Sequence, residues 1–379
     1  MAQAQSIFRY LQDNVTSILS DVERLVKAES PSNDQQLVDQ CGDVLKELFR
    51  EHLGVEAETL PHREQGDSLR FTYGTGEKQL LIIGHFDTVW EVGRLPYRVE
   101  GNRAYGPGIL DMKGGIIQAL WAVKACKQLN VPIPQKVVFL CNSDEEIGSP
   151  SSREWIEREA LKSEAVLVVE PAVALTGELK TSRKGIGIYS LTMRGKAAHA
   201  GNHHADGISA IEEMGRQIGY LHSLTDYGKG TTVNVGIAQG GTRTNIVAEQ
   251  AELHIDTRMV TAAEGERIEA CIQNIRPYLE GITIQVSGGI SRPPMERSAA
   301  TDRLFRQAAD CAAELGFELR ESAEPAGGGS DGNFTAALGI PTLDGLGSIG
   351  EGPHAEYEHI VIDQLAIRAA LLANLLTKL

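Results

Sequence analysis

The chain has 379 residues, of which 42% are apolar and 5% aromatic, so it is long enough for one or two domains with sizeable cores. Its 36 basic and 51 acidic side chains give a net charge of −15, which argues against nucleic acid or an anionic membrane as a partner. No CxxC pair, secretory signal pattern or apolar run of membrane-spanning length is found. We therefore expect reduced cysteines and a cytoplasmic protein.

The first part of the chain alternates helical and extended patterns. We expect helices at about 4–28, 35–52, 114–127 and 152–160, and strands at 68–73, 78–83, 136–141 and 165–169. Strands that alternate with helices favour an α/β fold, with a mostly parallel sheet and helices on both faces.

The pattern changes near residue 180. The next elements are expected as a strand at 185–193, a helix at about 207–222, strands at 231–238 and 248–259, a helix at about 263–278 and a strand at 282–287. This β-α-β-β-α-β order predicts an inserted α+β, ferredoxin-like domain over 181–293.

The alternation of the first part then resumes. We expect a helix at 300–315, a strand at 317–321, a helix after a glycine-rich loop, a strand at 341–343 and a last helix from about 361. Residues 1–180 and 294–379 would thus form one domain that the insert interrupts.

Polar side chains follow three of the buried strands at the point where each ends. His85 and Asp87 follow the first, Glu145 and Glu146 the second, and Glu170 the third. In parallel sheets such groups collect at the carboxyl edge. Taken singly, His85 with Asp87 can also be a loop histidine beside a solvated acid, and the paired glutamates a solvated turn.

The joint set is harder to explain as surface. Two histidines and three or four carboxylates at one sheet edge suit a pair of zinc-like ions. The members of this set are His85, Asp111, Glu145, Glu146, Glu170 and His354. Asp111 is a plausible bridging ligand, and the adjacent Glu145 and Glu146 allow one acid to bind metal while the other acts as general base.

Seven motifs, in this order along the chain, carry a family resemblance. They are HFDTV, GILDMKGG, DEEIGS, VVEP, RGKAAHAG, the GGGSD loop and GPHAEYEHI. Together they make the chain similar to the aminoacylase/carboxypeptidase family of co-catalytic zinc hydrolases, and most similar to its glutamate carboxypeptidase branch.

The resemblance implies two Zn²⁺ ions, with Co²⁺ or Mn²⁺ as alternatives. His85, Asp111 and Glu170 would hold one ion; Asp111, Glu146 and His354 would hold the other. It also implies a cis peptide bond after the bridging Asp111.

Two further roles come from the same resemblance. Glu145 would deprotonate the attacking water and pass the proton to the leaving amine. Asp87 would orient His85.

For the insert, the resemblance implies a lid and dimerisation domain. His199 would reach a neighbouring subunit's site as an oxyanion donor. The residues expected to contact substrate are Asn245, Arg258, Arg292, Gly328, Gly329 and Ser330. Arg292 is the expected partner of the substrate's α-carboxylate. On their own, His199 would be a structural loop histidine and the two arginines surface ion-pair partners.

The sequence departs from the glutamate carboxypeptidase pattern at one telling place. Glu178 stands near where that branch offers a lysine to the acidic side chain of its substrate, although Lys180, Arg183 and Lys184 lie close by. The pair 203–204, two histidines, is expected as exposed lid surface, with a third metal site as the less favoured alternative.

These patterns predict a di-zinc hydrolase that cleaves the amide bond of N-acylated or peptidyl amino acids and releases a C-terminal amino acid. The alternatives are an N-acetyl-amino-acid or succinyl-diamino-acid deacylase, or a dipeptidase. A non-catalytic scaffold on this fold is a remote alternative, because no ligand and no base is missing. We expect a homodimer formed through the lid domain.

Overall fold

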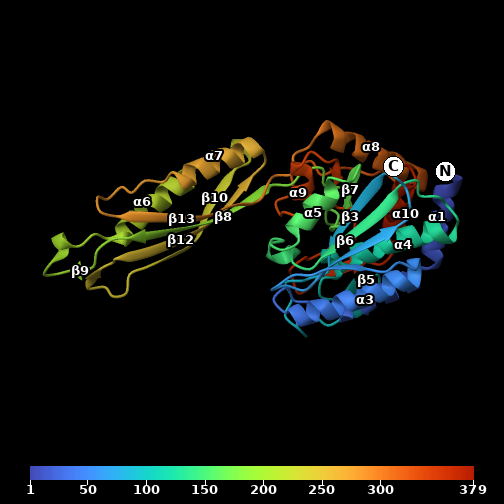
Figure 1. Ribbon diagram of the computed structural model, residues 1–379, viewed down its shortest axis with the longest axis horizontal. Helices are drawn as coiled ribbons and strands as arrows, with labels where there is room; N and C mark the ends of the chain where they lie inside the picture. Colours follow the sequence, from blue (N-terminus) through green and yellow to red (C-terminus); the bar gives the residue numbers. More distant parts are fainter. The chain divides into compact units, whose positions relative to one another are not determined.

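The computed structural model describes residues 1–379, and its largest sheet has six strands (Figure 1). These are β1 (Glu58–Leu60), β2 (Ser68–Tyr73), β3 (Gln79–His85), β6 (Lys136–Asn142), β7 (Ala165–Val168) and β14 (Thr342–Leu343). Their order across the sheet is β1-β2-β6-β3-β7-β14. β3 pairs in parallel with β6 and β7, and β7 with β14, whereas β1 and β2 add an antiparallel edge. The prediction of a mostly parallel sheet is confirmed.

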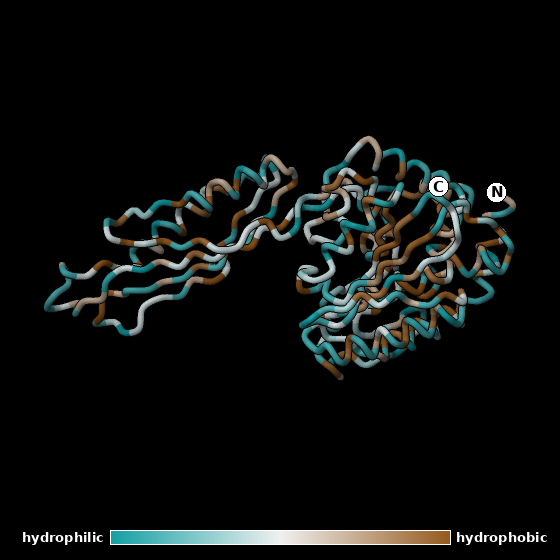
Figure 2. Tube along the Cα trace, viewed as in Figure 1, coloured by the Kyte–Doolittle hydropathy of each residue, from teal (hydrophilic) through white to brown (hydrophobic).

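Helices cover both faces of this sheet, as predicted. They are α1 (Ala2–Asp13), α2 (Val15–Lys27), α3 (Gln35–Leu53), α4 (Gly114–Gln128), α5 (Arg153–Ala160), α8 (Ala299–Leu315), α9 (Gly332–Ala337) and α10 (Gln364–Leu376). Alternate side chains of a strand point to opposite faces. Leu80 and Ile82 of β3 join the core with α1–α4, α8 and α10, whereas Leu81 packs with the side that carries α5 and α9. Burial on both faces explains the continuous apolar run of β3, which lies in the hydrophobic centre of Figure 2.

The parallel strands bring their carboxyl ends to one edge of the sheet. His85, the last residue of β3, lies opposite Asn142 of β6, and β7 runs in register on the other side of β3. At this edge the first turn of α4 comes close to the chain that leaves β7. A Cβ on Gly115 would clash with the carbonyl oxygen of Val169, so this approach requires glycine.

Three local features differ from the sequence-based expectations. The helix expected at 4–28 is broken at Asn14, whose amide donates to the carbonyl of Tyr10 at 2.8 Å. The prediction of a strand at 317–321 is wrong, because this segment makes only one isolated β-bridge, between Glu321 and Leu179. A small four-stranded sheet was not foreseen; it contains β4 (Arg98–Glu100), β5 (Arg103–Tyr105), β15 (Gly350–Glu351) and β16 (His359–Val361).

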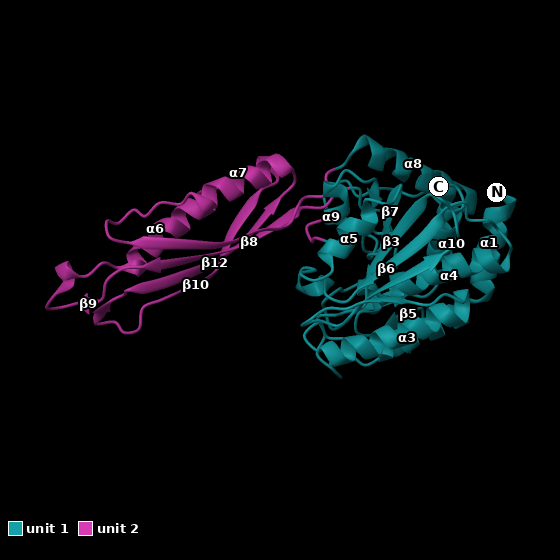
Figure 3. Cartoon of the chain, in the orientation of Figure 1, with its two compact units in different colours: residues 1–181, 297–325, 330–379 teal, residues 182–296, 326–329 magenta.

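The chain divides into two compact units (Figure 3). Unit 1 comprises Met1–Thr181, Arg297–Pro325 and Ser330–Leu379, and unit 2 comprises Ser182–Glu296 and Ala326–Gly329. The expected domain boundaries were 180/181 and 293/294, and the short segment 326–329 was not expected to join the insert. None of the helices combines the length and apolar character that a membrane-spanning helix needs.

Unit 2 is built around one antiparallel sheet in the order β10-β12-β8-β13. Its main elements are β8 (Gly185–Arg194), α6 (Ala210–Ser223), β10 (Thr232–Gly240), β12 (Gln250–Met259), α7 (Ala262–Gln273) and β13 (Thr283–Arg292). Leu221 of α6 and Ile268 of α7 pack on Leu253 of the sheet in one core. This arrangement is the ferredoxin-like fold that the element order predicted.

Candidate metal centre

The six side chains predicted as ligands or base gather in unit 1 at the carboxyl edge of its sheet. They lie at the end of β3 (His85), before α4 (Asp111), after β6 (Glu145 and Glu146), after β7 (Glu170) and between β15 and β16 (His354). The fold thus joins residues that are far apart in the sequence.

Asp111 lies between the two imidazoles. Its Oδ1 is 3.2 Å from Nε2 of His85, and its Oδ2 is 3.4 Å from Nε2 of His354. Glu170 adds an oxygen 3.7 Å from Nε2 of His85, and Glu146 adds one 3.1 Å from Nε2 of His354. This geometry matches the predicted ligand sets, each with one histidine, one further glutamate and a shared aspartate.

The backbone is unusual at two of these residues. The peptide bond between Asp111 and Met112 is cis, as the resemblance implied. His354 has a φ of 61°, in the left-handed region that residues other than glycine seldom adopt. A residue other than glycine keeps such a φ only where the surrounding contacts hold it.

Glu145 lies within the same cluster. Two groups of three residues offer possible ligand atoms that lie within 4.8 Å of one another. One group is His85, Glu145 and Glu170, and the other is His85, Asp111 and Glu146. Glu145 is therefore close enough to act on a group bound at the His85 position, and also close enough to be a ligand there.

The cluster holds more negative charge than its own groups neutralise. Burial, followed by the Asp111 carboxylate, raises the pKa of Glu146. Hydrogen bonds to Asp111 and Glu146 raise the pKa of His354 to about 10. Burial alone would lower the pKa of His85, but the carboxylates of Asp111 and Asp87 hold it well above its usual value. Without metal, the neighbouring carboxylates therefore favour the protonated form of both imidazoles.

These donors fit divalent metal ions. Imidazole nitrogens and carboxylate oxygens are common zinc ligands, and two divalent cations would supply the positive charge that the imidazolium protons otherwise provide. The residues that would hold the ions are His85, Asp111, Glu146, Glu170 and His354.

Metal binding at neutral pH should release at least about one proton per chain, because protonated His354, and any protonated His85, must lose the proton to become a ligand. Since the raised pKa of His354 is about 10, the metal affinity should increase with pH up to that value. Calorimetry at pH 7 in buffers of different ionisation enthalpy measures this release. His354→Ala should lower the number of protons released on metal binding by about one, whereas His203→Ala, at an exposed position, should leave that number unchanged.

Asp87 does more than the sequence indicated. The Nδ1 of His85 lies 3.1 Å from the backbone carbonyl of Asp87 and 3.5 Å from its carboxylate. That carboxylate accepts hydrogen bonds from the backbone N–H groups of Glu145 and Glu146, at 3.1 and 3.2 Å, and from the hydroxyl of Ser32 at 2.7 Å. Asp87 therefore fixes the turn that carries both glutamates as well as the ring of His85.

Glu358 is a buried carboxylate at this site that received no role from the sequence. It lies inside the GPHAEYEHI motif, but an acidic residue in a polar run gives no sign of burial. In the structure it is 0% exposed, and burial raises its pKa to about 7. Its contacts are described below.

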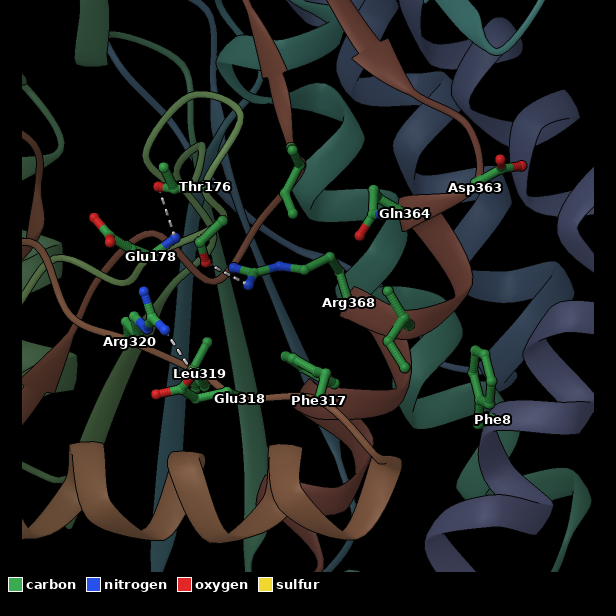
Figure 4. Close-up of a pocket in the computed structure, with 13 residues that line it drawn as sticks. Phe8, Thr176, Glu178, Phe317, Glu318, Leu319, Arg320, Asp363, Gln364 and Arg368 are labelled. Atoms are coloured by element: carbon green, nitrogen blue, oxygen red, sulfur yellow. Dashed lines mark hydrogen bonds and ion pairs between the residues drawn. The ribbon is translucent and has the colours of Figure 1, made fainter.

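Lys180 and Glu178 lie in two different surroundings. Lys180 donates from Nζ to the carbonyl of Pro171 at 2.8 Å, directly beside the candidate ligand Glu170. Glu178 instead lines a cavity of about 640 Å³ in unit 1, together with Phe317, Arg320 and other side chains (Figure 4). None of the six clustered residues lines this cavity.

Arg368, which also lines this cavity, stabilises the backbone that contacts Glu170. From α10 its guanidinium, labelled in Figure 4, donates to the carbonyls of Gly177, Gly345 and Gly347. The N–H of Gly347 in turn donates to the carbonyl of Glu170 at 2.9 Å. Burial lowers the pKa of Arg368 to about 10, so it stays charged at neutral pH.

Replacing Arg368 by methionine should lower the free energy of unfolding by about 3 kcal/mol, because it leaves three carbonyl groups without their donors. Arg9→Met, on the exposed side of α1, is the matched control and should change it by less than about 0.5 kcal/mol. Urea unfolding of the metal-free proteins gives both values. Equal effects would show that the three hydrogen bonds contribute little.

In unit 2, His199 and Asn245 lie together. They line a hollow of about 500 Å³ with Arg243 and Ile246, where β9 (Ala198–His199) pairs with β11 (Ile246–Val247). The Nδ1 of His199 accepts hydrogen bonds from two backbone N–H groups, at 3.1 and 3.0 Å. The proton of a neutral His199 is therefore on Nε2, which can donate. The histidines at 203–204 lie on the exposed surface.

The glycine-rich loop is surrounded by arginines of the same unit. Arg292 is 4% exposed, and its Cδ lies so close to Gly329 that a Cβ there would be 2.7 Å away. Arg258 forms a two-fold ion pair with Asp256 and donates to the carbonyl of Gly327 at 3.4 Å. Arg258 thus forms an ion pair, which was the alternative to a contact with substrate.

Ser330 lies at the start of the next segment of unit 1. Its side chain is buried, and its hydroxyl donates to Asp344 at 2.6 Å. This hydroxyl therefore stabilises the loop in the structure. The carbonyl of Gly328 accepts a hydrogen bond from Arg183 at 3.1 Å.

The histidine and carboxylate cluster, together with a match to a peptidase family, gives the class of the protein: it is a metallopeptidase. Residues 81–378 match the family described as peptidase family M20/M25/M40, and the chain belongs to this family. The clustered acidic and histidine side chains of this chain are able to bind metal.

Known relatives cover most of the chain. Carboxypeptidase G2 of Pseudomonas sp. (strain RS-16) is 30% identical over 98% of this chain and 92% of its own length. Acetylornithine deacetylase of Pasteurella multocida (strain Pm70) is 29% identical over 64% of this chain and 68% of its own length.

Solved structures share the fold. An M20 family metallo-carboxypeptidase of Sulfolobus solfataricus has a TM-score of 0.76 at 20% identity, covering 95% of this chain and 98% of that one. A dinuclear metal binding peptidase of Bacillus subtilis has a TM-score of 0.69 at 16% identity, covering 97% and 98%.

Proposed function

We propose that this metallopeptidase is a di-zinc carboxypeptidase that hydrolyses the amide bond of N-acylated or peptidyl amino acids and releases the C-terminal amino acid. The observation that carries the proposal is the position of Asp111, with one carboxylate oxygen toward each of His85 and His354. The similarity to carboxypeptidase G2 over 98% of the chain supports it.

Glu145 is the proposed general base. When bound, two divalent ions lower the pKa of water and polarise the scissile carbonyl. Glu145 then takes the proton of the attacking water and gives it to the leaving nitrogen. Asp87 holds the backbone of Glu145 at 3.1 Å, which fixes the base relative to His85.

Unit 2 is the proposed source of further substrate contacts. His199, with its proton on Nε2, would donate to the developing oxyanion at the site of a neighbouring subunit in a homodimer. Arg292 with the N–H groups of Gly328 and Gly329 would bind the α-carboxylate, and Asn245 would line the substrate site. The homodimer itself, like the cytoplasmic location, stays a prediction.

Lys180 is the proposed contact for an acidic substrate side chain. Its Nζ donates a hydrogen bond to the carbonyl of Pro171, the residue after Glu170, whereas Glu178 lines the separate cavity. A lysine there would favour substrates that end in glutamate or aspartate.

A deacylase is the second candidate, because acetylornithine deacetylase is 29% identical over 64% of the chain. The chemistry would be the same, but the free amino acid would be a diamino acid. A scaffold without activity is the remote alternative.

Amino-acid release from N-acetyl, N-benzoyl and peptidyl substrates ending in Glu, Ala, Lys, Leu or ornithine tests the proposal, with zinc-loaded and chelator-treated protein side by side. Zinc-dependent release that favours Glu and falls in Lys180→Met is the expected result. Preference for N-acetylornithine would favour the deacylase. No release by protein that carries two ions would support the scaffold.

A further inference from the structure

We infer that Glu358 is a positioning residue of the metal centre, because it holds the turn that carries Asp111 against the segment that carries His354. This inference rests on the proposed function, since it concerns the same pair of metal positions. It assigns a role to a carboxylate that is neither a ligand nor the base.

The contacts of Glu358 converge on the turn that carries Asp111. Its Oε1 accepts from the backbone N–H of Leu110 at 2.9 Å and of Asp111 at 3.1 Å. Its Oε2 accepts from the indole N–H of Trp90 at 2.6 Å and from the N–H of Gly108 at 3.3 Å. One side chain thus accepts hydrogen bonds from three backbone N–H groups in the segment 108–111.

The same side chain belongs to the segment of His354. Glu358 follows this histidine by four residues, and its own N–H donates to the carbonyl of Ala355 at 2.8 Å. The next residue, His359, pairs with Tyr105 in the small sheet. Asp111 and His354 are two of the three proposed ligands of one metal position. A change in their spacing would therefore weaken that position first, and the other position through the shared Asp111.

All four partners of Glu358 are donors, and this makes the residue type specific. An ionised carboxylate only accepts, and its two oxygens have room for four hydrogen bonds. A glutamine would direct an NH₂ group at one pair of these donors and leave them unpaired. The side chain is 0% exposed and no cation contacts it, so an ion pair does not explain its burial.

The test compares metal binding by Glu358→Gln, Glu358→Asp and the control Glu356→Gln. Glu356 lies two residues away, is exposed and pairs only with Arg94, so its substitution makes the same charge change outside the site. Zinc affinity is measured by competition with a chromophoric chelator, and Co²⁺ absorption reports ligand geometry. Far-UV circular dichroism and thermal unfolding of the metal-free proteins report folding.

Glu358→Gln should bind at least one of the two ions about 10- to 100-fold more weakly, with a changed Co²⁺ spectrum. Glu358→Asp keeps a carboxylate, but its side chain is one methylene shorter and its oxygens lie farther from the donors. Its zinc affinity should therefore lie between that of Glu358→Gln and that of the unaltered chain. The control should bind as the unaltered chain does. If Glu358→Gln does not fold, Glu358→Asp and Trp90→Phe, which removes one donor, carry the test, and each should weaken binding measurably while the fold is kept.

Folded Glu358 variants with unaltered zinc affinity and Co²⁺ spectrum would overturn the inference, even if they unfold at a lower temperature. The readout needs no substrate, so the two claims fail separately. Two bound ions without amidohydrolase activity would reject the proposed function and leave the inference in place. An unaltered chain that binds no pair of ions would reject both.

Discussion

Glu145→Gln should lower kcat by about 10²- to 10⁴-fold and leave zinc affinity nearly unchanged. The loss is expected because the substitution removes the group that takes the proton from water and returns it to the leaving nitrogen. The backbone of residue 145 would still be held by Asp87, so the geometry of the neighbouring Glu146 should persist. Steady-state hydrolysis and zinc competition, measured on the same preparation, check both parts.

Glu154→Gln is the matched control, since Glu154 is exposed on α5 and makes the same change of charge outside the site. It should keep full activity. A Glu145→Gln enzyme with more than about a tenth of normal kcat would contradict the role as base. A loss of zinc binding together with activity would instead make Glu145 a ligand, which its place within 4.8 Å of His85 and Glu170 allows.

Asp111→Asn should reduce the bound metal from two ions to at most one per chain and lower activity by at least about 10³-fold, or about 4 kcal/mol of transition-state stabilisation. The reason is that the carboxylate of Asp111 lies 3.2 Å from Nε2 of His85 and 3.4 Å from Nε2 of His354, and is the proposed shared ligand. An amide offers one oxygen without charge, so it cannot serve both ions. Elemental analysis after dialysis and hydrolysis assays measure the two effects.

Asp13→Asn, at the exposed end of α1, is the control for the change of charge and should retain both ions. Glu146→Gln gives a useful contrast, because Glu146 lies 3.1 Å from Nε2 of His354 and belongs to one proposed ligand set, so its loss should affect one ion more than the other. If Asp111→Asn kept two ions with normal affinity, Asp111 would not be the shared ligand.

Sequence patterns were informative where burial is uniform or alternates regularly. The run that forms β3 is buried on both faces, so its apolar character alone marked it as a central strand. The ladder of the insert was visible because β8 and β12 alternate buried and less buried residues. The clustering of His85, Glu145, Glu146 and Glu170 followed from this, because parallel strands must deliver the residues at their ends to one edge.

Other features depend on contacts that no local pattern reports. Segment 317–321 has an alternating pattern but finds only a single bridge to Leu179, so it is not a strand. Asn14 breaks a helix of good apolar spacing by bonding back to Tyr10. Glu358 acts on Asp111 across 247 residues, and only the folded chain shows that its donors meet there.

The most direct test of the account is a zinc titration of chelator-stripped protein, with release of glutamate from an N-acylated glutamate as the readout. We expect negligible activity without metal, a rise with added zinc, and a plateau at about two ions per chain. Stripped protein that keeps full activity, or a chain that binds no zinc at the cluster of His85, Asp111 and His354, would contradict it.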